Sequence, residues 1–171
     1  MQLAKLWGAK VIGSASSSDK RALVTSLGAD GVVDPEVADL TAAIVAANGG
    51  KKVNIVLEMA GGKVFDQSLQ ALAPFGRLVT FGMASRSMPE PINPGALMGT
   101  SRAVIGFWLV HCMARPDRMI APQLAELFEL MESGKIKAVV GGSYPLSEAR
   151  RAHEDLRGRK TTGKVFLDPK L

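Results

Sequence analysis

The stretch Val53-Asn-Ile-Val-Leu57 is a short run of mostly apolar, β-branched residues, and a helical pattern and a second such run follow it. Phe65, Leu69 and Leu72 recur at the spacing of one helical face, and the next apolar run is Leu78-Val-Thr-Phe81. We therefore expect a strand, a helix and a strand in succession. Because the strand runs are continuous rather than alternating, we expect strands covered on both faces, as in a parallel sheet.

The same alternation extends outward along the chain. Further strand-like runs are Lys10–Gly13, Gly31–Val33 and Ala103–Trp108. The helical stripes between the runs are Leu23 and Leu27, ended by Gly28, and Leu40, Ile44 and Ala47, ended by Gly49-Gly50. A repeat of strand and helix every ~20–25 residues is the βαβ pattern. It predicts an α/β fold with a Rossmann-type, doubly wound parallel sheet.

The opening segment departs from this pattern. Leu3, Leu6 and Trp7 form the end of an amphipathic helix. Gly8 terminates that helix, and the chain then runs directly into the strand around Val11. A doubly wound domain has a strand and a glycine-rich turn before such a helix. We therefore expect a sheet that lacks its first strand and its glycine-rich turn.

The character of the chain changes after Trp108, and we place a boundary near Pro116. The next helix has an apolar face of Leu124, Leu127, Phe128 and Met131, with Gly134 at its end. We then expect a strand at Ala138–Val140, a helix capped by Ser147 and a strand at Lys164–Leu167. Residues 117–171 are thus predicted to form a small α+β segment.

Composition narrows the class of protein. The chain has 47% hydrophobic and 22% charged residues, as in ordinary globular proteins, and its net charge of +5 is scattered. With few aromatic residues, a nucleic-acid partner is disfavoured. The single cysteine, Cys112, excludes an internal disulfide and a multi-cysteine zinc site in this segment. No signal-peptide pattern or bilayer-length apolar run is present, so we expect a cytoplasmic location and no membrane partner.

A family resemblance is carried by four stretches that follow one another along almost the whole chain. They are Gln2-Leu-Ala-Lys-Leu-Trp-Gly-Ala-Lys-Val-Ile-Gly13, Leu27-Gly-Ala-Asp30, Gly76-Arg-Leu-Val-Thr-Phe-Gly82, and Tyr144-Pro-Leu-Ser-Glu-Ala149 with Ala152-His153 and Thr162-Gly163-Lys164. Together they resemble the C-terminal part of a medium-chain dehydrogenase/reductase. Within that family they are similar to the quinone oxidoreductase branch, of the zeta-crystallin type.

The resemblance implies a role for each part of the chain. Residues 1–116 would be a dinucleotide-binding domain without the Gly-Gly-Val-Gly turn that precedes Gln2 in the family, and residues 117–171 would complete the catalytic lobe. Because the amides of that turn hold the cofactor pyrophosphate, we expect a chain that begins at Met1 to bind NADPH weakly or not at all. Zinc ligands, where relatives have them, would lie largely in the missing lobe.

Cofactor choice is argued from the end of the strand at Val11. An NAD-specific domain usually has an acidic residue there for the ribose 2′-hydroxyl, whereas this strand ends in Gly13-Ser-Ala-Ser-Ser-Ser18. The small side chains leave room for a 2′-phosphate, and the resemblance places Lys20 where these reductases bind it. The expected NADP contacts here are Gly13, Ser14, Ser16 and Lys20.

Two observations oppose this interpretation. Ser17 or Ser18 is alternatively only a helix N-cap, with Lys20 a solvated residue of the first turn. Asp34 stands where many of these reductases carry a tyrosine that packs on the phosphate, and a carboxylate there would repel it.

The remaining cofactor contacts follow from the resemblance. They are Met59, Ala60, Phe81, Gly82 and Met83 after two strands, Phe107 and Trp108 near the nicotinamide, and Arg159 and Lys164 in a basic turn that folds back towards the cofactor. Each group also has a purely structural interpretation. The residues after the two strands would be ordinary strand-to-helix turns, the aromatic pair would belong to the core of an interface, and the basic turn would be an exposed loop.

No residue of the chain is a convincing proton donor or metal ligand, so catalytic residues stay unknown. His111 and Cys112 are neighbours on an expected strand and point to opposite faces, so they are not expected to form a dyad. His153 shares a helical face with apolar residues, and we expect a core histidine.

The sequence thus predicts part of an NADP-dependent oxidoreductase that transfers hydride from NADPH to a quinone or conjugated carbonyl without metal. The alternatives are the cofactor domain of a zinc-dependent alcohol dehydrogenase and a non-catalytic binding or dimerisation module. The apolar edge strand Ala103–Val110 is expected to form a homodimer, with Phe107, Leu109 and Val110 near the interface.

Overall fold

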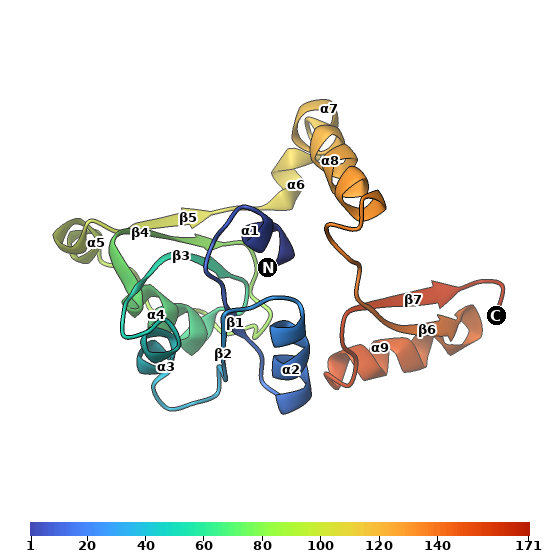
Figure 1. Ribbon diagram of the computed structural model, residues 1–171, viewed down its shortest axis with the longest axis horizontal. Coiled ribbons are helices and arrows are strands. Elements are labelled where there is room, and N and C mark those ends of the chain that lie inside the picture. The colour runs from blue at the N-terminus through green and yellow to red at the C-terminus, as the bar shows by residue number, and fades with distance from the viewer. The chain divides into compact units, whose positions relative to one another are not determined.

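The computed structural model describes residues 1–171, and the chain divides into two compact units, 1–122 and 123–171. The strands of the first unit are β1 (Ile12–Ser14), β2 (Gly31–Val33), β3 (Val53–Glu58), β4 (Leu72–Thr80) and β5 (Ala103–Gly106). Its helices are α1 (Gln2–Leu6), α2 (Ser18–Ser26), α3 (Leu40–Ala47), α4 (Gly62–Gln70), α5 (Pro94–Thr100), α6 (Leu109–Cys112) and α7 (Pro116–Met119). Figure 1 labels these elements.

Helix α8 (Ala121–Glu132) begins at the end of the first unit and continues into the second. The second unit contains β6 (Val140–Pro145), the short 3₁₀ helix η1 (Leu146–Glu148), α9 (Ala149–Arg157) and β7 (Lys164–Asp168). Strands β6 and β7 pair in parallel, and the Tyr144 hydroxyl of β6 donates to Asp155 Oδ2 of α9 at 3.0 Å. No helix of the chain combines the length and apolar character that a membrane span needs.

The strands of the first unit pair in parallel, as the alternation of strands and helices predicts, but they form two sheets rather than one doubly wound sheet. Strand β1 pairs with β2, and β3, β4 and β5 form a three-stranded sheet in that order, which places β5 at an edge. Helix–strand packing is close at Gly13, because a Cβ there would collide with Val24 of α2. Glycine at this position therefore lets β1 and α2 pack closely.

One face of the three-stranded sheet holds the core. Phe65 of α4 packs with Leu72 and Leu78 of β4, and each of the three is at most 3% exposed. Leu57 and Ile105, which point to the other face, are 67% and 43% exposed. The expectation of cover on both faces is therefore wrong for this sheet, since within the chain only the face that meets α4 is buried.

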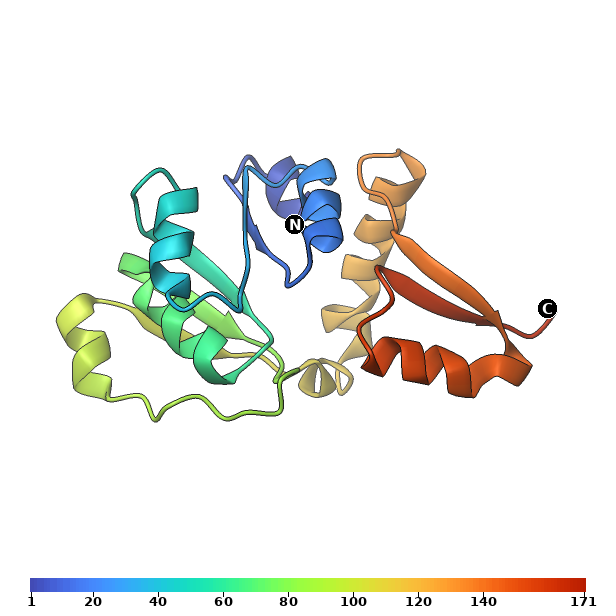
Figure 2. The ribbon, with the colours of Figure 1, turned by 90° about the horizontal axis from the view of Figure 1, so that it is seen from below.

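The two sheets of the first unit are connected through α3 and α4, which lie side by side in Figures 1 and 2. Gln67 of α4 makes the connection. Its side-chain Oε1 accepts from Leu40 N at 2.6 Å, and its Nε2 donates to the Ala38 carbonyl at 3.3 Å. Its backbone carbonyl accepts from the Thr41 hydroxyl at 2.8 Å. We call this set of three bonds the Gln67 bridge.

Four local predictions are wrong. Leu72 begins β4 rather than continuing the helix, which ends after Gln70, because the chain turns at once into an irregular strand with Phe75 at φ +62°. Residues 109–112 form helix α6 instead of strand, since the apolar run suits either state. The strand expected at Ala138–Val140 lies later in the chain, because β6 runs from Val140 to Pro145. Ser147 lies in η1 and does not cap α9, whose N-cap is Glu148.

Candidate functional site

The predicted site residues of the first unit lie where parallel strands end, at the carboxyl edges of the two sheets. Open α/β sheets bind ligands at this edge. Three groups of residues occupy it: the loops after β1 and β2, the loops after β3 and β4, and a pocket at the ends of β4 and β5.

An ion pair lies across the ends of β1 and β2. Ala15 N donates to the Val33 carbonyl at 3.1 Å and so prolongs the pairing of these strands. Arg21, in the first turns of α2, donates from Nη1 to the Ala15 carbonyl at 2.9 Å and to Asp34 Oδ2 at 2.8 Å. The side chains of Arg21 and Asp34 are 28% and 31% exposed, so the pair is partly withdrawn from water. Asp34 is therefore paired with a cation, a contact that the sequence analysis did not predict.

The residues after β1 were interpreted either as contacts to the 2′-phosphate of NADP or as the N-terminal cap and first turn of a helix. Ser17 is the N-cap of α2 and its hydroxyl accepts from Lys20 N at 3.3 Å, which confirms the capping alternative for Ser17. Lys20 is half-buried in the first turn of α2. Ser14 is exposed at the end of β1 and Ser16 is half-buried in the following loop, while Gly13 has the packing role described above. Their contact with a cofactor stays a prediction.

The loops after β3 and β4 are held together by backbone hydrogen bonds. Phe81 N donates to the Glu58 carbonyl, Ala84 N to Met59 O and Ser85 N to Ala60 O, at 3.0, 2.8 and 2.9 Å. The loop after β3 and the loop after β4, which were both predicted to contact the cofactor, are therefore hydrogen-bonded to each other.

Glu58 fixes the turn that opens α4. This residue is only 3% exposed, and its Oε1 accepts from Ala60 N at 2.6 Å and from Gly61 N at 2.9 Å. Oε2 is buried without a hydrogen-bond partner in the chain. Gly61 has φ +78°, and a Cβ there would press on Met83 and Ser87, so this glycine is required by both the backbone and the neighbouring loop.

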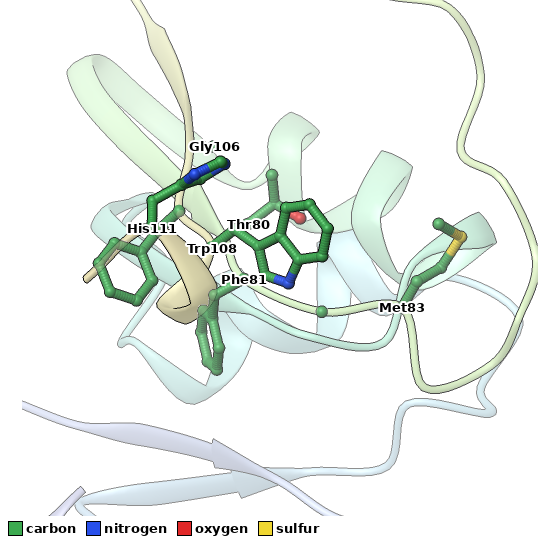
Figure 3. A pocket seen from close by; sticks show the side chains of 8 residues that line it. Thr80, Phe81, Met83, Gly106, Trp108 and His111 are labelled. Carbon is green, nitrogen blue, oxygen red and sulfur yellow. The ribbon is translucent and has the colours of Figure 1, made fainter. Parts of the chain in front are cut away.

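A pocket of about 490 Å³ opens at the ends of β4 and β5 (Figure 3). It is lined by Thr80, Phe81, Gly82, Met83, Gly106, Phe107, Trp108 and His111. Five of the predicted cofactor contacts are thus brought together, namely Phe81, Gly82, Met83, Phe107 and Trp108. The rings of Trp108 and His111 meet edge to face, with centroids 5.4 Å apart and an interplanar angle of 90°.

Three lining residues were missed by the sequence reasoning. Thr80 and Gly106 are the last residues of β4 and β5, so the rule that ligands bind at carboxyl ends would have found them. His111 was placed on a strand, but it belongs to α6, whose turn returns its ring to Trp108. Its neighbour Cys112 is buried, whereas His111 is exposed.

The pocket suits a flat, unsaturated ligand. Aromatic rings and Met83 provide surfaces for stacking and dispersion contact, and His111 is the only titratable side chain of the lining. Nothing within 4 Å would meet a Cβ at Gly106, so the space beside this lining residue is open. In the chain no group of three His, Cys, Asp or Glu side chains could hold a metal ion.

The remaining predicted residues lie in the second unit. Arg159 has φ +54° just after α9, and Lys164 begins β7; both are exposed, and their approach to a cofactor stays a prediction. His153 is exposed on α9, so the prediction of a core histidine is wrong. The reason is that only Ala152 of this helix is buried.

Two groups away from the pocket titrate abnormally. The hydrogen bond from Lys5 lowers the pKa of Asp30 below its ordinary 3.8, and a bond from Val11 N adds to the effect. The hydrogen bond to Asp155 raises the pKa of Tyr144 above its ordinary 10.0. The first contact connects α1 to the segment before β2, and the second connects β6 to α9.

Comparisons with known proteins agree with this geometry. The family model described as zinc-binding dehydrogenase matches residues 1–129. A quinone oxidoreductase of Pseudomonas aeruginosa is 32% identical over 168 residues, which cover 98% of this chain and 51% of that protein. The chain therefore spans about half the length of the curated relatives it matches.

Solved structures extend the likeness to the fold. Escherichia coli quinone oxidoreductase complexed with NADPH has a TM-score of 0.83 and 32% identity, with 98% of this chain and 52% of that chain covered. A cobalt- and zinc-bound thermostable alcohol dehydrogenase from Pyrobaculum aerophilum has a TM-score of 0.74 and 28% identity, with 98% and 45% covered. The predicted Rossmann-type α/β class is confirmed.

Proposed function

Because the chain belongs to the zinc-binding dehydrogenase family, in its quinone oxidoreductase branch, we propose that the protein is an NADP(H)-dependent oxidoreductase. Its substrate is a quinone or a conjugated carbonyl, reduced without a metal. The observation that carries the proposal is the aromatic pocket at the carboxyl ends of β4 and β5. It offers stacking surfaces and one imidazole, which suits the orientation of a flat ring rather than acid–base work by several charged groups.

The pocket residues fit the nicotinamide half of the cofactor. Phe81, Phe107 and Trp108 present aromatic surface, and Gly106 leaves the backbone open to close approach, whereas Gly82 lies against Met59. The bound cofactor would supply the hydride that passes to the substrate. The protein's own residues would orient the ring through the aromatic side chains of the pocket. Backbone hydrogen bonds hold the loops after β3 and β4 to each other.

The adenosine half would lie at the ends of β1 and β2, with Ser14, Ser16 and Lys20 as contacts. Met59 and Ala60 would border the cofactor between the two halves. Arg159 and Lys164 of the second unit are proposed to contact it from residues 117–171, as part of a catalytic lobe.

A cytoplasmic homodimer is the proposed working form. Strand β5 stands at a sheet edge, and Phe107, Leu109 and Val110 beyond it are 48%, 59% and 56% exposed. An apolar edge of this kind favours pairing with a second copy.

Turnover of the purified, complete protein tests the proposal. We expect NADPH oxidation with a quinone acceptor, a much slower rate with NADH, and the same rate after treatment with a metal chelator. Rapid alcohol oxidation with NAD that a chelator abolishes would instead establish the alternative, a zinc-dependent alcohol dehydrogenase, which the likeness to the Pyrobaculum enzyme favours. Cofactor binding without any turnover would indicate a binding or dimerisation module.

A further inference from the structure

The Arg21–Asp34 pair occupies the position at which a Rossmann-type domain distinguishes its cofactors. Arg21 comes from the start of α2, Asp34 follows β2 directly, and the Ala15 carbonyl follows β1 directly. The adenosine ribose of a dinucleotide lies at the carboxyl end of the strand that β1 represents. A guanidinium is thus anchored beside the expected place of the ribose 2′ substituent.

The anchoring leaves the guanidinium able to bind an anion. A guanidinium has five N–H donors, and the bonds to Ala15 and Asp34 both come from Nη1. The donors of Nε and Nη2 remain for a ligand, and their planar fork matches the oxygens of a phosphate. The Arg21 side chain is 28% exposed, so part of it is open to solvent.

The pair also changes the charge that Asp34 presents. An unpaired carboxylate beside a phosphate would repel it, whereas the salt bridge at 2.8 Å offsets this charge. Asp34 Oδ1 is held by Glu36 N at 3.0 Å, so the carboxylate is fixed from both sides. Asp34 therefore acts on the site as a positioning group for Arg21.

We propose that Arg21, positioned by Asp34, is a specificity-determining contact for the 2′-phosphate of NADP(H). The proposal rests on the proposed function and extends its cofactor site beyond Lys20. Arg21 has two tasks: it binds the phosphate and it cancels the charge of Asp34.

The test measures binding of two probes that differ only in the 2′-phosphate, adenosine 2′,5′-bisphosphate and adenosine 5′-monophosphate, by calorimetry on the complete protein. We expect wild type to prefer the bisphosphate. Arg21→Ala should lose about tenfold to a hundredfold in bisphosphate affinity and nothing for the monophosphate. Adding Asp34→Ala should restore part of the loss, because no unpaired carboxylate remains. Arg77→Ala, at an exposed arginine of β4, is the matched control and should bind both probes as wild type does.

The outcomes separate this inference from the proposed function. A wild-type protein with no preference for the bisphosphate overturns the choice of NADP(H) and this inference with it. A wild-type preference that survives Arg21→Ala overturns the inference alone. Equal losses for both probes in Arg21→Ala would assign Arg21 a purely structural role, and a double variant no better than Arg21→Ala would remove Asp34 from the account.

Discussion

Replacement of Glu58 by alanine should destabilise the first unit, because the carboxylate holds the turn that connects β3 to α4. Its Oε1 accepts from two backbone amides, and the Gly61 amide is itself buried. A hydrogen bond to a charged group contributes about 1.5–3 kcal/mol, and an unsatisfied buried donor costs about 1–3 kcal/mol. Against this, the substitution removes Oε2, which is buried without a partner. We expect a net loss of about 2–4 kcal/mol in the free energy of unfolding.

Urea unfolding followed by tryptophan fluorescence isolates this effect. The chain has two tryptophans, Trp7 and Trp108, and both lie in the unit 1–122. Glu58→Gln keeps an acceptor oxygen for the two amides and should therefore cost less than Glu58→Ala does. Glu90→Ala, at an exposed glutamate of the same unit, is the matched control and should change stability by less than about 0.5 kcal/mol. The reasoning is refuted if Glu58→Ala unfolds at the same urea concentration as wild type, or if Glu58→Gln is as unstable as Glu58→Ala.

Three further predictions concern cofactor, assembly and pH. In the complete protein, Lys20→Ala should weaken NADPH binding by about tenfold to a hundredfold and leave NADH nearly unchanged, as measured by calorimetry; equal losses would make Lys20 structural. Light scattering should find a homodimer, and Val110→Asp should dissociate it by placing a charge in α6, on the exposed apolar segment just beyond β5; a wild-type monomer or a dimer unaffected by this charge would exclude this interface. The single tyrosine, Tyr144, should titrate above 10.0 in phenolate absorbance, and Asp155→Asn should lower that midpoint. Because the folded pKa is raised, the hydrogen bond stabilises the second unit below pH 10.0 and is lost as pH rises through the raised value.

The sequence predicted the elements that short-range patterns specify. The strand Gly31–Val33 and the end of α2 before Gly28 agree with the structure, because periodicity and a glycine at φ +98° act within a few residues. The parallel arrangement followed from the order of strands and helices. Leu72 and residues 109–112 were assigned wrongly, since an isolated apolar residue or run satisfies a helix and a strand equally well.

The sequence predicted which loops form the site, but it did not predict which side chains contact one another there. The carboxyl-end rule located Phe81 and Phe107, which line the pocket. The pairing of Arg21 with Asp34 joins residues 13 positions apart on different elements, and no pattern in the sequence specifies which cation a given carboxylate will meet. His111 lines the pocket because residues 109–112 form helix α6, and the sequence analysis had placed them on a strand.

The Gln67 bridge has a consequence for cooperativity. The two sheets of the first unit share no strand pairing, so the β1–β2 sheet is a candidate for an independently opening unit, with an opening free energy below that of global unfolding. Gln67 couples this opening to the three-stranded sheet through residues 38, 40 and 41. A dinucleotide that contacts both sheets would act as a second coupling, because it binds only when both are closed. Amide hydrogens of β1 and β2 should then exchange faster than those of β4 in the free protein and slow selectively when the cofactor binds.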